Sequence, residues 1–178
     1  MQNWHLFFLF LVINTAVIAQ DNAAGPYIKD YGKVYQIPNP DLETNTQMTY
    51  KVVYDIYDKQ RDPKRVNRQL NTAARFLNMH GQAGVSLENL KVACVVHNKA
   101  GFDMMDNESY KEKYGVDNPN LPLLEQLQAA GVEIILCGQT AYSRKIDRER
   151  LAKPVKIGLS AMTAILELSN EGYHLIKF

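Results

Sequence analysis

The sequence predicts an α/β fold with a doubly wound, mostly parallel five-stranded sheet and helices on both faces. Segments rich in β-branched and aromatic residues alternate with segments whose apolar residues recur at helical spacing. The runs at residues 91–97 and 132–136 are almost entirely apolar, which is typical of parallel strands covered on both faces. Parallel neighbours need crossover connections, and those crossovers are right-handed. The alternation therefore indicates strands joined through helices.

The first half of the chain supplies two strands. Met48–Asp55 is rich in valine and tyrosine and reads as the first. Asp62-Pro63 then resembles a helix start, because proline is tolerated in a first turn, and the helix should end near His80-Gly81. Lys91–His97 is the expected second strand. The polar loop that follows, residues 98–120, is long enough to be functional or partly structured, with a short helix at Tyr110–Tyr114.

The second half continues the alternation. Pro122 opens a helix that Gly131 ends, and Ser160 is placed to cap another that Gly172 ends. The remaining expected elements are a third strand at 132–136, one or two helical turns at 146–151, a fourth strand at 155–159 and a last strand at 173–178. Residues 48–178 therefore form the predicted α/β domain.

Two segments precede that domain. Residues 1–20 contain no charged side chain and hold an apolar core, Leu6–Ile18, which is typical of an export signal. We expect a signal peptide at 1–19, cleaved after Ala19, and a periplasmic protein with no stable membrane insertion after cleavage. A retained anchor is the alternative, although the apolar run is shorter than the ~20 residues that span a bilayer. Residues 20–47 carry three prolines and predict an arm lying over the domain or a neighbouring subunit.

Composition and motifs argue against several classes of protein. A formal net charge of +1 gives no strong electrostatic field that would attract nucleic acid or anionic lipid. Two cysteines are too few for a disulfide scaffold, and the four histidines lack the spacings of a structural zinc site, so we expect no metal. No glycine-rich phosphate-binding motif is present, so no nucleotide cofactor is expected either.

Cys137 is the best candidate for chemistry. It ends the third strand, and ligands of open α/β sheets bind outside the carboxyl ends of the strands. A thiol reacts as thiolate, which nearby cations stabilise, and Arg144 and Lys145 follow closely enough to supply positive charge. Gln139 offers a hydrogen bond. The alternative, that Cys137 is a small buried hydrophobe, carries about equal weight on spacing alone.

Three other residues complete the candidate list. His97 ends the second strand on the same edge as Cys137 and can act as a proton shuttle or as a structural histidine. Asp55, at the end of the first strand, fits a turn or capping role better than the rim of a site. Cys94 lies in mid-strand, where a buried structural role is expected. A disulfide between Cys94 and Cys137 is therefore not expected.

The segments Leu123–Thr140 and Val155–Tyr173 resemble the DsrE/DsrF-like (YchN-like) family of sulfur-relay proteins. The order of helix, Ala-Gly-Val, strand and cysteine is that in which the family's sulfur carriers place their active cysteine. The resemblance covers residues 48–178. It implies a persulfide on Cys137, a homo-oligomer built from trimers (a trimer or hexamer), and a sulfur donor or acceptor that is a protein or a small sulfur compound.

Two functions are therefore expected from different classes. The first is an exported sulfurtransferase-like carrier in which Cys137 accepts sulfane sulfur, Arg144 or Lys145 stabilises the anion and His97 manages protons. The second is a non-catalytic oligomeric module that binds a small ligand at the strand ends, with Cys137 incidental. A buried and unreactive thiol would favour the second.

Overall fold

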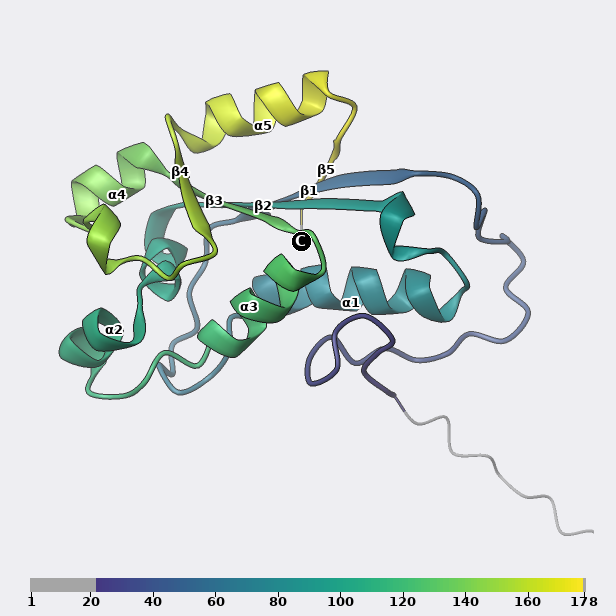
Figure 1. Ribbon diagram of the computed structural model, residues 1–178, viewed down its shortest axis with the longest axis horizontal. Helices are drawn as coiled ribbons and strands as arrows, with labels where there is room; N and C mark the ends of the chain where they lie inside the picture. Colours follow the sequence, from purple (N-terminus) through teal and green to yellow (C-terminus); the bar gives the residue numbers. More distant parts are fainter. Residues whose placement is uncertain (1–21, 178) are drawn as a thin grey trace, which may run out of the picture.

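A computed structural model describes residues 22–177 and contains one five-stranded, entirely parallel sheet (Figure 1). Its strands are β1 (Tyr50–Ile56), β2 (Leu90–Val96), β3 (Glu133–Cys137), β4 (Val155–Gly158) and β5 (His174–Ile176). Their order across the sheet is β4-β3-β2-β1-β5. The predicted α/β fold and five-stranded sheet are confirmed, with every neighbouring pair parallel.

The register brings the carboxyl ends of the central strands to one edge. Tyr50 pairs with Leu90 and Ile56 with Val96, so β1 and β2 end together. Val96 pairs in turn with Leu136, and Cys137 pairs with Gly158. The residues that follow these strands therefore gather on one side of the molecule, where ligands of open α/β sheets bind.

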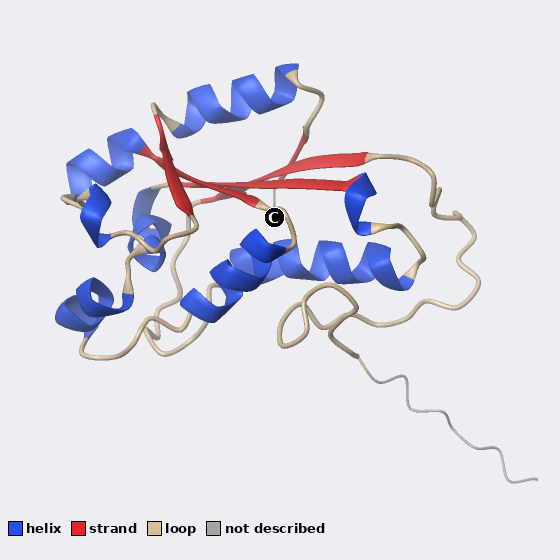
Figure 2. Cartoon of the chain, in the orientation of Figure 1, coloured by secondary structure: helices blue, strands red, loops and turns tan. Residues whose placement is uncertain are grey.

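Helices cover both faces of the sheet. The helices α1 (Arg68–Gln82) and α3 (Leu121–Ala129) pack on one face, and α5 (Ala161–Asn170) lies across the other (Figures 1 and 2). The larger core lies on the α1 side, with fully buried Leu70, Leu77 and Leu124. The smaller core beneath α5 contains Val53, Val95 and Cys137. The shorter α2 (Asn107–Tyr114) and α4 (Gly138–Arg144) lie at the strand-end side.

The helix predicted from Asp62-Pro63 begins six residues later, at Arg68. Asn67 caps it, accepting hydrogen bonds from the backbone N–H of Gln69 and Leu70. Asp62 instead closes a turn, because its carboxylate accepts from the Lys64 N–H at 3.0 Å. Proline is as well suited to such a turn as to a helix start, and the true cap lies further along the chain.

Helix α4 was not predicted, and the helical turns expected at 146–151 are a three-residue 3₁₀ turn, Arg148–Arg150. The seven residues of α4 begin with glycine and include serine and threonine, which are weak helix formers. Packing holds the segment in place: Ala141 is buried, and the side chain of Thr140 accepts from the Asn98 N–H. Tertiary contacts thus override weak local propensity here.

The segment before β1 is held against α1 by one buried side chain. Asn78 accepts from the Ile28 N–H at 2.8 Å and donates to the carbonyl oxygens of Ile28, Tyr31 and Gly32. Gly32 lies so close to the α1 backbone that a Cβ atom there would be 2.4 Å from the carbonyl carbon of Ala74. Of the arm that the sequence predicts at 20–47, residues 28–32 therefore pack on the domain, whereas residues 35–45 are exposed.

The predicted signal peptide, residues 1–19, lies outside the described residues. Among residues 22–177, no helix has the length and apolar character needed to cross a membrane.

A buried polar network connects the loop after β1 with the segment after β2. Asn67 donates from its amide to Asp103 at 2.8 Å, and its backbone N–H donates to the side-chain oxygen of Asn120 at 2.8 Å. Asn118 donates to the carbonyl oxygens of Asp103 and Met105. Burial raises the pKa of Asp103 to about 6, despite the opposing hydrogen bond from Asn67. The network gives this irregular segment a defined conformation.

Candidate functional site

A pocket of about 440 Å³ opens at the carboxyl edge of the sheet, beside the start of α5. Its polar and reactive side chains come from four different strand ends and from the α5 cap: Asp55, His97, Cys137, Gln139, Ser160 and Lys177. Met162 and Ile165 of α5 form its apolar wall. The fold thus brings Cys137, His97 and Gln139 together, as the sequence led us to expect.

Cys137 is the last residue of β3, and the chain turns into α4 immediately after it. Only glycine fits at the next position: a Cβ on Gly138 would lie 2.6 Å from the Gly158 oxygen and 3.1 Å from the Leu159 oxygen. This close approach seats the start of α4 against β4. Cys137 itself is only 5% exposed, although it lines the pocket.

The surroundings of the thiol favour its anionic form. Burial would raise the pKa of Cys137, but hydrogen bonds from the Thr140 backbone and hydroxyl and from the backbone N–H groups of Ala161 and Gln139 outweigh it, so the pKa lies below its usual value. The N–H groups belong to the first turns of α4 and α5, where backbone donors lack helical partners. The thiolate is therefore stabilised by neutral donors.

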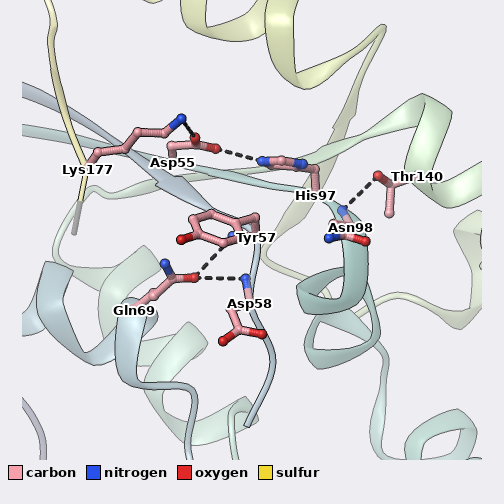
Figure 3. A network of polar contacts seen from close by, with 8 residues as sticks. All are labelled: Asp55, Tyr57, Asp58, Gln69, His97, Asn98, Thr140 and Lys177. Carbon is pink, nitrogen blue, oxygen red and sulfur yellow. Dashed lines mark hydrogen bonds and ion pairs between the residues drawn. The ribbon is translucent and has the colours of Figure 1, made fainter.

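Thr140 is oriented by the loop that follows β2. The backbone N–H of Asn98 donates to Thr140 Oγ1 at 3.0 Å, which directs the hydroxyl hydrogen elsewhere (Figure 3). Asn98 takes a left-handed conformation, with φ of 54°, that asparagine tolerates better than most residues. The end of β2 thereby positions a hydrogen-bond donor for the cysteine at the end of β3.

A second polar group lines the same pocket as the thiol. Asp55 is buried. One oxygen of its carboxylate accepts a hydrogen bond from His97 Nε2 at 2.7 Å, and the other lies 2.8 Å from Lys177 Nζ (Figure 3). A carboxylate can only accept, so Nε2 carries the hydrogen and His97 Nδ1 is left as an acceptor. Nδ1 has no hydrogen-bond partner within residues 22–177. The hydrogen bond and charge of Asp55 raise the pKa of Lys177, which therefore stays cationic.

The sequence missed Lys177 and assigned Asp55 to a turn or cap. Asp55 instead lies inside β1, where it accepts a hydrogen bond from His97 and forms an ion pair with Lys177. β5 pairs with β1 in parallel, and Tyr54 pairs with Ile176, so the residue after β5 falls next to Asp55. The only signal in the sequence was a lysine within the predicted last strand, residues 173–178, and the structure ends that strand at Ile176, one residue earlier. It becomes informative once the strand order is known.

Arg144 and Lys145, expected to supply charge to Cys137, do not line its pocket. They face a separate hollow with Phe102 and Glu112. Arg144 donates to the side chain of Asn98, and its guanidinium lies 5.5 Å from the Phe102 ring centre. Helix α4 turns the chain between Cys137 and these cations, so closeness in sequence does not become closeness in space. Lys177 is the cation that the pocket contains.

Cys94 occupies the middle of β2, fully buried, and burial raises its pKa to about 12. Both cysteines are free, as expected. No cluster of three or more potential metal ligands occurs among the residues that the structure describes.

Comparison with known proteins agrees with this architecture. The model of the DsrE/DsrF-like family matches residues 51–178. Two solved structures each align with 72% of this chain and 99% of their own at 18% identity: a protein of unknown function, MTH1491, from Methanobacterium thermoautotrophicum (TM-score 0.55) and the ychN protein from E. coli (TM-score 0.54). At this identity they show a shared fold. No curated protein sequence gives a significant match.

Proposed function

Because this chain belongs to the DsrE/DsrF-like family, which is associated with sulfur relay, we propose that it is an exported persulfide carrier whose sulfur-bearing atom is Cys137 Sγ. The observation that carries the proposal is a strand-end thiol whose pKa is lowered by hydrogen bonds inside a pocket. A thiolate is the form that attacks sulfane sulfur. The resemblance of the segment that ends at Cys137 to the family's sulfur carriers supports the choice of this residue.

The proposed transfer is a thiolate displacement. Cys137 Sγ attacks the outer sulfur of a persulfide R–S–SH, a new S–S bond forms, and the donor's S–S bond breaks with the electron pair leaving on R–S⁻. Cys137 then holds the outer sulfur with its hydrogen. His97 Nδ1, oriented by the Asp55 contact to Nε2, accepts that proton. Attack on the outer sulfur by an acceptor thiolate returns Cys137 to its starting form.

Lys177 and Gln139 have supporting roles in this proposal. The Lys177 ammonium is paired with Asp55, and its remaining N–H groups can donate to an anionic sulfur donor or to the persulfide anion. The amide of Gln139 reaches the Leu159 carbonyl at 3.5 Å and lines the entrance. Arg144 and Lys145 have no part in it, since they lie in a different hollow.

Intact mass measured after incubation with polysulfide tests the carrier. We expect wild-type protein to gain about 32 Da, the mass of one sulfur atom, and to lose it on adding a thiol reductant. Cys94→Ala is the matched control and should keep the gain, because the Cys94 thiol is fully buried. Absence of the gain in wild type, or an equal gain in Cys137→Ala, contradicts the proposal.

A non-catalytic small-ligand module is the second candidate, and the 5% exposure of Cys137 favours it. The pocket is then the binding site and the thiol is part of its wall. Iodoacetamide distinguishes the two functions, since a carrier must expose its sulfur to small molecules. Rapid alkylation of Cys137 in folded protein supports the carrier. Alkylation only after unfolding supports the ligand module.

We also propose a homo-oligomer, a trimer or hexamer, in which a second copy covers the outer face of α5. Four apolar side chains on α5, on α4 and in the connection just before α5 are largely exposed: Leu159 at 72%, Met162 at 76%, Leu166 at 65% and Tyr142 at 90%. Apolar residues gathered on one face mark an interaction surface. Met162 also lines the Cys137 pocket, so the neighbouring copy would adjoin the site.

Light scattering tests the oligomer. We expect wild-type protein to form an oligomer and Met162→Glu to dissociate it, because the substitution places a charge on this apolar face. A monomeric wild type contradicts the proposal.

Export belongs to the same proposal and rests on the composition of residues 1–19. Amino-terminal sequencing of protein recovered from the periplasm should begin at Gln20. Recovery with Met1 retained argues for an anchor or for no cleavage.

A further inference from the structure

A second pocket, of about 650 Å³, lies at the carboxyl end of β1 and is lined by charged side chains. Five cationic and two anionic side chains fall between residues 57 and 69, a net charge of +3 in a chain whose total is +1. Arg61, Arg65 and Arg68 all line the pocket. With Lys59 they make four cations in the lining, against the two acids Asp58 and Asp62, so the lining carries a net charge of +2.

The three guanidinium groups have no partner on the described part of the protein. None of them forms a hydrogen bond or ion pair with another residue in the range 22–177. The two acids of the loop are used locally: Asp58 accepts from the Lys59 N–H at 2.9 Å and Asp62 from the Lys64 N–H at 3.0 Å. The two carboxylates also line the pocket but offset only part of its positive charge, and like charges gathered in this way destabilise a protein. An anion between the arginines would remove that cost.

Two further residues that line the pocket, Gln69 and Lys59, indicate which groups can bind a ligand. Gln69 Oε1 accepts from the backbone N–H groups of Tyr57 and Asp58, at 3.1 and 3.0 Å, so its amide nitrogen remains as a donor without a partner in the described chain (Figure 3). Lys59 is engaged elsewhere, with its ammonium 3.8 Å from the Tyr114 ring centre. The N–H groups of Gln69 and Leu70 are satisfied by Asn67. Binding therefore depends on the arginine side chains and the Gln69 amide.

We propose that this pocket binds a small oxyanion ligand, one that carries phosphate or sulfate groups. Arginine presents planar pairs of N–H donors that match the oxygen spacing of such groups, and three arginines around one hollow suit more than one negative charge. The site is separate from the Cys137 pocket, although the two are neighbours: the Tyr57 ring, which lines the arginine pocket, lies 6.1 Å from the His97 ring. The proposal does not depend on sulfur transfer.

Calorimetric titration of the purified protein with inorganic pyrophosphate at low ionic strength tests this site, with sulfate in a second titration to separate the two oxyanions. We expect binding that weakens as salt is added, because the attraction is between charges. Arg65→Gln and Arg68→Gln should each weaken it about tenfold, the loss expected for one charge-assisted hydrogen-bonding group. The triple change that includes Arg61→Gln should abolish measurable binding.

Arg148→Gln is the matched control, since Arg148 is exposed, lies outside the pocket and also has no side-chain partner in the described chain. Its pyrophosphate affinity should equal that of wild type. No binding by wild type, equal losses in Arg148→Gln and the pocket variants, or retention of heparin without pyrophosphate binding would each overturn the proposal. Alkylation of Cys137 should be the same in all variants, which separates this site from the sulfur site.

Discussion

Replacing Gly138 by alanine would separate the start of α4 from β4 and so disturb the donors around Cys137. The added Cβ would lie 2.6 Å from the Gly158 carbonyl oxygen, where ordinary contacts begin at 3.4 Å. The two segments must therefore move apart by about 0.8 Å. Gly158 pairs with Cys137 in the sheet, so its carbonyl oxygen cannot move away without straining that pairing.

Two opposing effects set the size of the change. Alanine is a better helix former than glycine by up to about 1 kcal/mol, which would stabilise α4. Overpacking against backbone atoms typically costs about 1–3 kcal/mol. We expect the cost of steric overlap to exceed the gain in helix propensity, so that the free energy of unfolding falls by about 1–2 kcal/mol. We also expect slower alkylation of Cys137 at neutral pH, because the N–H groups of Gln139 and Thr140 move away from the sulfur.

Urea unfolding and the rate of iodoacetamide alkylation measure these two effects. Gly131→Ala is the matched control: Gly131 has a φ of +83°, which costs a non-glycine residue about 1–2 kcal/mol, and it has no atom within 4 Å of the added Cβ. Both variants should lose stability, but only Gly138→Ala should lose thiol reactivity. A Gly138→Ala protein as stable and as reactive as wild type would refute this account of the site.

Two further predictions concern single polar groups. Thr140→Val removes the hydroxyl that lowers the pKa of Cys137, so the pH profile of alkylation should move to higher pH, and an unchanged profile would deny Thr140 that role. Asp103 has a pKa of about 6 in the folded protein and about 3.9 when unfolded, so between these values the folded state keeps a proton that the unfolded state has lost. The free energy of unfolding should therefore fall by about 3 kcal/mol as pH rises from about 4 to about 6. Asp103→Asn should remove this fall in urea titrations, and a wild-type-to-variant difference independent of pH would contradict it.

The sheet was predictable because its signals are local. Apolar runs such as those of β2 and β3 carry the strand pattern within a few residues, and glycine and proline mark where they stop. The helix boundaries were harder to predict from the sequence. The start of α1 depends on Asn67, whose amide also joins a buried network with Asp103, and α4 depends on packing rather than on helix propensity.

For the candidate site, the sequence alone determined that a cysteine ends a buried strand beside a glycine, and that a histidine ends the neighbouring one. Both facts follow from short-range patterns. The tertiary structure decided which charges accompany them, bringing Lys177 to Asp55 through the β1–β5 pairing and turning Arg144 away through α4. The interaction between two charges depends on their distance in space and not on their separation in the sequence. The parallel pairing of β1 with β5 brings together segments that are more than a hundred residues apart in the chain, so only the tertiary structure could show this contact.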